Sequence, residues 1–432
     1  MIRRVLTSLV VSAACAGVLA AASTSTSPAA DPLVVHEWGT FTSVAGPDGT
    51  AVEWSPLGGP EDLPCFIDRA RPAEIGAAQI GNILVKGPFY GQLSALPGAA
   101  GINAALTSTR AVTAAGVPAP LVSGRIRMET PVLYFYSPEA AKVDVKVAFR
   151  QGAMSEWYPK AIVPRLDIGR PLAATTDTIE WKGVEVRPGP DQAYPSDGSK
   201  SHYYAARAVD AAPLRVGSQD EKFLFYRGVA DFQPLLTAVV EPEGAVTVDG
   251  PAASMRMILF EKRADAVGYR VVESVGRTRI ERPALTGTAA SIRRDLTALL
   301  TDEGLYPREA AAMVETWRDS WFEEGLRVFY ILPRTAVDDR LPLTITPAPA
   351  AIARVFVGRL ELITDDMKND VERALVTGDL DTLNMYGRFL DSIVAQIANR
   401  PSLAANPAKV ADALRALAKP WQAAAVSSCG RS

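Results

Sequence analysis

The chain has only 2 histidines, and each lies in a short segment that also contains other ionisable and aromatic residues. These segments are residues 34–42 and residues 201–207. Imidazole, carboxylate and phenol groups carry out general acid–base catalysis when they meet in one cleft. We therefore predict a catalytic site that both segments share with residues 128–133. Its six members are His36, Glu37, Glu129, His202, Tyr204 and Arg207, the last as charge support.

A metal site is an alternative use of the same residues, because two histidines and one carboxylate form a known ligand set. A hydrogen-bonded structural histidine is a simpler interpretation of each segment. No fixed spacing links the two segments, and 3 cysteines with 2 histidines exclude a multi-cysteine zinc site. We therefore predict no metal ligand, and the sequence indicates no particular cofactor.

The adjacent residues His36 and Glu37 should point to opposite faces if residues 34–42 form one strand. One of them then faces apolar surroundings, where burial raises the pKa of a carboxylate toward the range useful for catalysis. The alternative is a carboxylate tied to a backbone donor or an arginine, with a structural role only. Glu129 presents the same choice, because strand phase places it on the core face and it needs a partner such as Arg207.

Three aromatic residues are candidates for substrate binding, namely Trp38, Trp157 and Tyr158. The adjacent pair near a turn is suited to stacking on sugar rings, and burial of one member in the core is an equally good interpretation. The sequence contains no nucleophile elbow, His-Glu-x-x-His motif, P-loop or dinucleotide-binding fingerprint. The familiar catalytic templates therefore assign no reaction.

The N-terminus has the layout of a secretory signal peptide, with Arg3 and Arg4 followed by an apolar, alanine-rich stretch. We predict cleavage after residue 22, with cleavage after residue 30 as the alternative. Attachment as a lipoprotein through Cys15 is disfavoured, because the residues that follow stay apolar. No later stretch is apolar enough to span a bilayer. The mature protein is expected to be soluble and either periplasmic or secreted.

The charge of the chain narrows the range of partners. The formal net charge is −3, without a visible cluster of lysine or arginine. Because nucleic-acid-binding proteins normally carry a basic surplus, we expect no nucleic-acid partner. An extracellular polymer or a component of the cell envelope suits an exported protein better. Cys65 and Cys429 remain after signal removal, and the sequence leaves their pairing open.

Hydrophobic patterning predicts an α+β fold. Residues 31–285 contain short segments of alternating apolar and polar residues, such as 143–150, separated by proline and glycine. We predict an antiparallel β-sandwich region there, as one sandwich or as two divided near residues 165–195. Residues 75–120 are expected to form a long loop or a small helical insert that shapes a cleft. Residues 286–432 are predicted to be mainly α-helical with a few strands.

Individual elements can be placed within these regions. Strands predicted at residues 34–44 and 202–209 would carry the two histidines. A helix is predicted over residues 307–324, because proline favours the first helical turn and a glycine follows the last. Trp317 and Trp321 share one face of this helix, and we interpret them as core residues.

Four segments form a distinctive set: residues 36–42 (His-Glu-Trp-Gly-Thr-Phe-Thr), 128–131 (Met-Glu-Thr-Pro), 223–228 (Phe-Leu-Phe-Tyr-Arg-Gly) and 315–322 (Glu-Thr-Trp-Arg-Asp-Ser-Trp-Phe). They resemble segments of a group of exported bacterial proteins that has no assigned activity. The resemblance covers most of the mature chain. It implies a shared fold and transfers no catalytic role to any residue.

Two functions therefore follow from the sequence. The first is an exported hydrolase or lyase that acts on an extracellular polymer through the six predicted acid–base residues. The second is a non-catalytic binding or scaffold protein of the cell envelope. The first requires His36 and His202 to meet in space, whereas the second does not.

Overall fold

The computed structural model describes residues 32–54, 63–70, 124–164 and 170–424. The expected signal peptide, residues 1–22, and the expected insert, residues 75–120, lie outside the described residues. In the described part of the chain, no helix is both long and apolar enough to cross a membrane.

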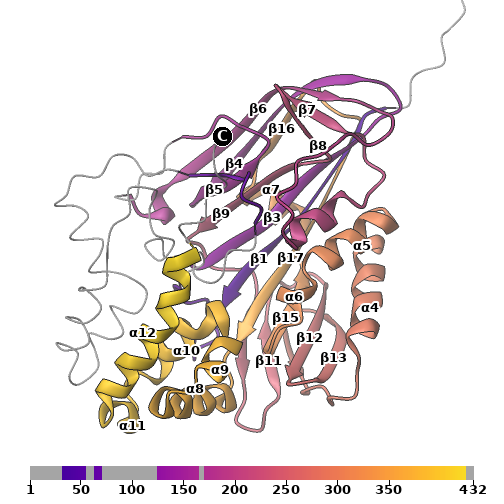
Figure 1. The fold of residues 1–432 in the computed structure, drawn as a ribbon. Coiled ribbons are helices and arrows are strands. Elements are labelled where there is room, and N and C mark those ends of the chain that lie inside the picture. Colours follow the sequence, from indigo (N-terminus) through magenta and orange to yellow (C-terminus); the bar gives the residue numbers. More distant parts are fainter. Residues whose placement is uncertain (1–31, 55–62, 71–123, 165–169, 425–432) are drawn as a thin grey trace, which may run out of the picture.

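One mixed β-sheet of 14 strands forms the centre of the molecule (Figure 1). Its strand order is β13-β12-β15-β17-β1-β3-β9-β5-β6-β4-β16, with β2, β7 and β8 paired alongside, and a smaller sheet has the order β10-β11-β14. The strands are β1 (Val34–Val44), β2 (Asp68–Arg69), β3 (Ile126–Tyr136), β4 (Ala141–Arg150), β5 (Gly152–Tyr158), β6 (Thr176–Val186), β7 (Leu214–Val216), β8 (Gln219–Glu221), β9 (Leu224–Ala230), β10 (Thr237–Val240), β11 (Val246–Asp249), β12 (Met255–Arg263), β13 (Ala266–Ser274), β14 (Arg277–Ile280), β15 (Gly325–Ile331), β16 (Leu343–Thr346) and β17 (Ala351–Leu362).

Most described helices follow the smaller sheet in sequence. The α-helices are α4 (Ala289–Asp302), α5 (Pro307–Thr316), α6 (Arg318–Trp321), α7 (Arg334–Arg340), α8 (Asp365–Thr377), α9 (Leu380–Met385), α10 (Leu390–Ile397), α11 (Pro401–Ala404) and α12 (Pro407–Ala424). The 3₁₀ helices are η2 (Leu172–Ala174), η3 (His202–Arg207) and η4 (Gly387–Phe389). The α8 helix ends at Gly378, whose positive φ of 75° is the left-handed conformation that glycine adopts readily.

Strand β1 occupies the middle of the large sheet, where it pairs in parallel with β17 and antiparallel with β3. The bounds predicted for this strand, residues 34–44, are confirmed. Because β17 and β15 come from the region predicted to be mainly helical, strands from both predicted regions pair within one sheet. The sheet likewise continues across residues 165–195, since β5 and β6 are paired. The α+β class is confirmed, whereas a β-sandwich is not.

Two groups of helices cover one face of the large sheet (Figure 1). Helices α4–α6 and η3 share an apolar cluster with side chains of β1, β3, β9, β12 and β15. Helices α8–α12 form a second cluster, which meets the end of β1 at Val44. The sheet is curved, so that side chains on its opposite face contact each other. Phe41 of β1 stacks there on Phe149 of β4, with ring centroids 6.4 Å apart.

Two predicted elements differ from the structure. Residues 202–207 form the 3₁₀ helix η3 instead of a strand, because the Ser201 side chain accepts a hydrogen bond from the Tyr203 amide and caps its first turn. The predicted helix 307–324 is interrupted at Trp317, where α5 ends and α6 begins. The prediction that Trp317 and Trp321 are buried is confirmed.

Gly358 provides a test of the packing between two central strands. It pairs directly with Tyr330, and a Cβ atom at Gly358 would lie 2.0 Å from Cζ of that tyrosine. We expect Gly358→Ala to lower the free energy of unfolding by about 1–3 kcal/mol, as overpacking does in other cores. In a Tyr330→Leu background the same change should have a much smaller effect. Equal effects in both backgrounds, measured by urea denaturation, would contradict this account.

Candidate functional site

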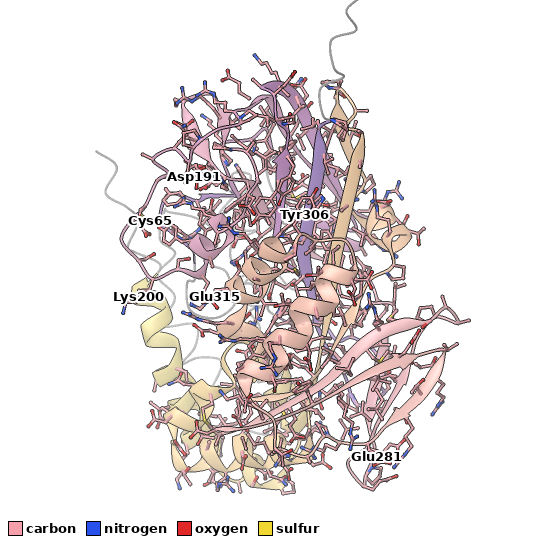
Figure 2. All side chains as sticks on the ribbon, turned by 90° about the vertical axis from the view of Figure 1, so that its right-hand side faces the viewer. Cys65, Asp191, Lys200, Glu281, Tyr306 and Glu315 are labelled. Carbon is pink, nitrogen blue, oxygen red and sulfur yellow. The ribbon has the colours of Figure 1, made fainter. Side chains whose placement is uncertain are left out.

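His36 lies on the face of the sheet that α5 covers. Its Nδ1 atom is 2.7 Å from Glu309 of α5, and both side chains are buried. The imidazole ring contacts Tyr306 and Tyr136 at centroid distances of 4.5 and 5.0 Å, and the Tyr136 hydroxyl donates a hydrogen bond to Glu309. Figure 2 shows Tyr306 beside β1. His36 is therefore held by a carboxylate that the sequence did not single out.

Glu37 points to the opposite face, as strand phase predicts. Its carboxylate accepts hydrogen bonds of 2.5 Å from Tyr226 of β9 and from Arg354 of β17. Arg354 also donates to Asp338 at 2.7 Å. Because Glu37 is fully buried and bound by a guanidinium group, it resembles a structural ion pair more than a catalytic base.

The other four predicted residues each have a different main partner. Glu129 pairs with Arg388, so the expectation that Arg207 would neutralise it is wrong. The individual pairings are His202 with Asp319 at 2.8 Å, Tyr204 with Asp197 at 2.7 Å, and Arg207 with Glu221 at 2.6 Å.

Within the described part of the chain, only Tyr204 and Arg207 of the six contact each other, through a guanidinium group 4.9 Å from the ring centroid. The two histidines are held by different carboxylates on separate helices, His36 by Glu309 of α5 and His202 by Asp319 of α6. Among the described residues, no group of three or more His, Cys, Asp or Glu side chains is arranged to hold a metal ion. The predicted shared site is not assembled.

The three aromatic candidates do not form an exposed platform. Trp38 and Tyr158 are buried, and Trp157 is partly buried against the core. Cys65 is disulfide-bonded, whereas the other two cysteines, Cys15 and Cys429, lie outside the described residues.

A network of buried and partly buried charges lies on the His36 face of the sheet, further along β1. Arg359 of β17 binds Glu323 and Glu361 at 2.5 and 2.6 Å, and Arg327 of β15 binds Glu361 at 2.8 Å. We call the whole set the arginine–glutamate network; its members are Glu129, Glu323, Arg327, Arg359, Glu361 and Arg388. Three guanidinium groups balance three carboxylates, as buried charges require.

Three of the four distinctive segments, residues 36–42, 128–131 and 315–322, lie at this network, and the remaining one, residues 223–228, contacts the second. Thr42 of the first segment lies opposite Arg359, and Thr40 lies opposite Glu129 of the second. Arg227 of the third segment donates to Thr130 of the second, and the carbonyl of Trp321 in the fourth accepts from Arg327. These segments therefore contribute to the internal packing of the sheet.

Arg327 also fixes the turn that precedes β15. Its guanidinium group donates to three main-chain carbonyls, those of Trp321, Glu323 and Glu324, at 2.7–2.8 Å. Gly325 completes the turn with a φ of 123°, and a Cβ atom there would lie 3.0 Å from Arg327 Nη2. Only glycine fits this position without strain. The turn thus directs Glu323 to the network and places Glu324 against a neighbouring pocket.

This pocket, which we call the Glu324 pocket, has a volume of about 270 Å³. It lies between the end of β12, the start of β15 and the start of α8, with Tyr386 contributed from the end of α9. It is lined by Glu261, Lys262, Arg263, Ala264, Arg282, Glu324, Gly325, Leu326, Thr364, Asp366, Met367, Asp370 and Tyr386.

Most charged groups around the pocket already have partners. Glu261 binds Arg263 at 2.7 Å and Arg282 through two hydrogen bonds of 2.6 and 2.7 Å. Asp366 pairs with Arg263. Asp370 pairs with Arg373 and accepts a hydrogen bond from Tyr386.

Glu324 and Lys262 are the exceptions. Glu324 accepts a hydrogen bond of 2.9 Å from the Ala264 amide, and neither charged side chain forms an ion pair with any residue in the described ranges. Burial raises the pKa of the Glu324 carboxyl group above its ordinary value, against weaker opposing effects of that amide and of nearby cations. The pocket thus presents one carboxylate and one ammonium group that the protein leaves unpaired.

Comparison with known proteins assigns no family to this arrangement. No protein-family model matches the chain, and no curated protein is similar to it. The interpretation of the Glu324 pocket therefore rests on its own chemistry.

The importance of the arginine–glutamate network can be tested at Arg327. Arg327→Met leaves Glu361 buried with one partner fewer and releases the turn carbonyls, so we expect a loss of about 3–5 kcal/mol in the free energy of unfolding. The exposed pair Arg150–Asp339 offers a control, in which Arg150→Met should cost about 1 kcal/mol or less. Similar small losses in both variants, measured by chemical denaturation, would show that the network is not structurally important.

The unpaired state of Glu324 predicts a dependence of stability on pH. Because its pKa is raised on folding, the folded protein holds this proton more tightly, and stability is lost as pH rises through the raised pKa. Glu324→Gln should therefore stabilise the protein at neutral pH, by ~0.5 kcal/mol, and have no effect near pH ~3, where the carboxyl is protonated in both the folded and the unfolded state. The exposed Glu139→Gln serves as control and should change stability at neither pH. A Glu324→Gln variant that is less stable at neutral pH would contradict the assignment.

Proposed function

We propose that the protein is an exported, non-catalytic binding protein of the cell envelope that holds a small charged ligand in the Glu324 pocket. The signal-peptide pattern of residues 1–22 supports export. The pocket between β12, β15 and α8 supports a binding role. A ligand-binding role needs only a preformed, charged cavity and no acid–base pair.

The observation that carries this proposal is the pairing of charges around the pocket. Arg263, Arg282 and Asp366 each have a partner, whereas Glu324 and Lys262 do not form ion pairs within the described part of the protein. Leaving a partly buried charge unpaired reduces stability, and such groups are typical of functional sites. A ligand with complementary charge would supply the missing partners.

The positions of the predicted catalytic residues support binding over catalysis. His36, Glu37 and Glu129 are each buried and held by one partner or more, and none of the six predicted acid–base residues lines the Glu324 pocket. A volume of about 270 Å³ suits a small molecule, because sites for drug-sized ligands begin near ~300 Å³. A hydrolase or lyase acting on a polymer would require a groove with an acid and a base. The binding role therefore agrees better with these observations.

A thermal-shift screen of small charged compounds tests the proposal. At least one compound should raise the melting temperature of the wild-type protein, and Glu324→Gln or Lys262→Gln should abolish that rise. Glu139→Gln and Lys160→Gln are matched controls, since both residues are exposed and outside the pocket, and both variants should keep the response. The proposal fails if no compound stabilises the protein, or if the stabilisation survives both pocket substitutions.

A further inference from the structure

We infer that the ligand of the Glu324 pocket is a small zwitterion of the α-amino-acid class, with its ammonium group bound by Glu324 and its carboxylate bound by Lys262. This inference rests on the proposed binding function and specifies the chemistry of the ligand.

The two unpaired groups are neighbours, Lys262 on β12 and Glu324 in the turn that enters the adjacent strand β15. Lys262 of β12 pairs with Gly325 of β15, the residue that follows Glu324. Their charged atoms lie more than 4.0 Å apart, since no salt bridge joins them, and the Lys262 charge only partly offsets the effect of burial on the pKa of Glu324. Two unlike charges that are close but not in contact form a pair of binding points, one for a cation and one for an anion.

The remaining charges exclude a ligand with two like charges. A dicarboxylate would need a second free cation, but Arg282 is held by Glu261, and Arg263 is shared between Glu261 and Asp366. A diamine would need a second free carboxylate, but Asp370 is bound by Arg373 and Tyr386. A ligand without charged groups would leave both Glu324 and Lys262 without a partner. One positive and one negative charge satisfy the pocket.

The size and lining of the pocket limit the rest of the ligand. About 270 Å³ exceeds the ~150 Å³ of a cavity that holds benzene. Leu326, Met367 and the ring of Tyr386 supply apolar surface beside the charged groups. An amino acid with a small or medium-sized apolar side chain therefore fits better than a large polar one.

Both walls of the pocket are anchored by contacts within the protein. Arg327 fixes the turn that carries Glu324 through three carbonyl contacts. Arg388, two residues beyond Tyr386, pairs with Glu129 of β3 and ties the opposite wall to the sheet. A rigid site reduces the entropy lost when a ligand binds, which favours recognition of a small molecule.

Isothermal titration calorimetry with matched probes tests the inference. Glycine, L-alanine, L-leucine and glycine betaine are titrated first, and the tightest binder is compared with its two single-charge analogues. For L-leucine these are 3-methylbutylamine, which lacks the carboxylate, and 4-methylpentanoate, which lacks the ammonium group. We expect each analogue to bind at least tenfold more weakly than the zwitterion.

Substitutions then assign each charge to its partner. Glu324→Gln should weaken L-leucine and 3-methylbutylamine at least tenfold and leave 4-methylpentanoate unchanged, whereas Lys262→Gln should weaken L-leucine and 4-methylpentanoate and leave the amine unchanged. Glu139→Gln and Lys160→Gln should affect none of them. Amine binding as tight as that of the zwitterion, or acid binding as tight, would overturn the zwitterion while leaving the proposed function intact. If none of the four zwitterions binds but other compounds stabilise the protein in the thermal-shift screen, the zwitterion is likewise overturned and the proposed function stands. If neither experiment yields a binder, both proposals are overturned.

Discussion

The arginine–glutamate network is the interaction on which the rest of this structure depends. Burying a charge requires a partner of opposite sign and good geometry, and this network provides both for three arginines and three glutamates. Its members come from β3, β15, β17, η4 and the turn before β15. The network therefore joins the centre of the sheet to the helices that cover it, and it determines where the Glu324 pocket lies.

The distinction between positioning and binding explains why the most unusual sequence motifs are not the site itself. Residues 36–42 place Thr40 and Thr42 beside the network, and residues 128–131 contribute Glu129 to it. These segments contribute to the arginine–glutamate network, whereas Glu324 and Lys262 line the pocket beside it.

Local patterning predicted much of the fold. The alternation of residues 34–44 gave the bounds of β1 and placed His36 and Glu37 on opposite faces, because period-two patterning is a local property. The partners of these residues were not predictable, since Glu309 and Arg354 are 273 and 317 positions away. The strand expected at residues 202–209 was wrong because a capping serine outweighed β propensity.

The Glu324 pocket could not be predicted from the sequence. Glu324 had the position of an ordinary last helical residue before a glycine, and the helix was expected to continue to it. In the structure the helix is interrupted at Trp317, and Arg327 binds the carbonyls that follow. We assign Glu324 to the binding site because its carboxylate lacks an ion-pair partner in the described part of the chain. Which side chains pair is decided by the tertiary structure, so the spacing of residues along the sequence could not predict it.

A crystal structure of the protein with its tightest-binding zwitterion tests the central claim most directly. Our account predicts the ligand in the Glu324 pocket, with its ammonium nitrogen within hydrogen-bonding distance of Glu324 and its carboxylate beside Lys262. A direct Glu324–Lys262 salt bridge with the ligand bound elsewhere would contradict it.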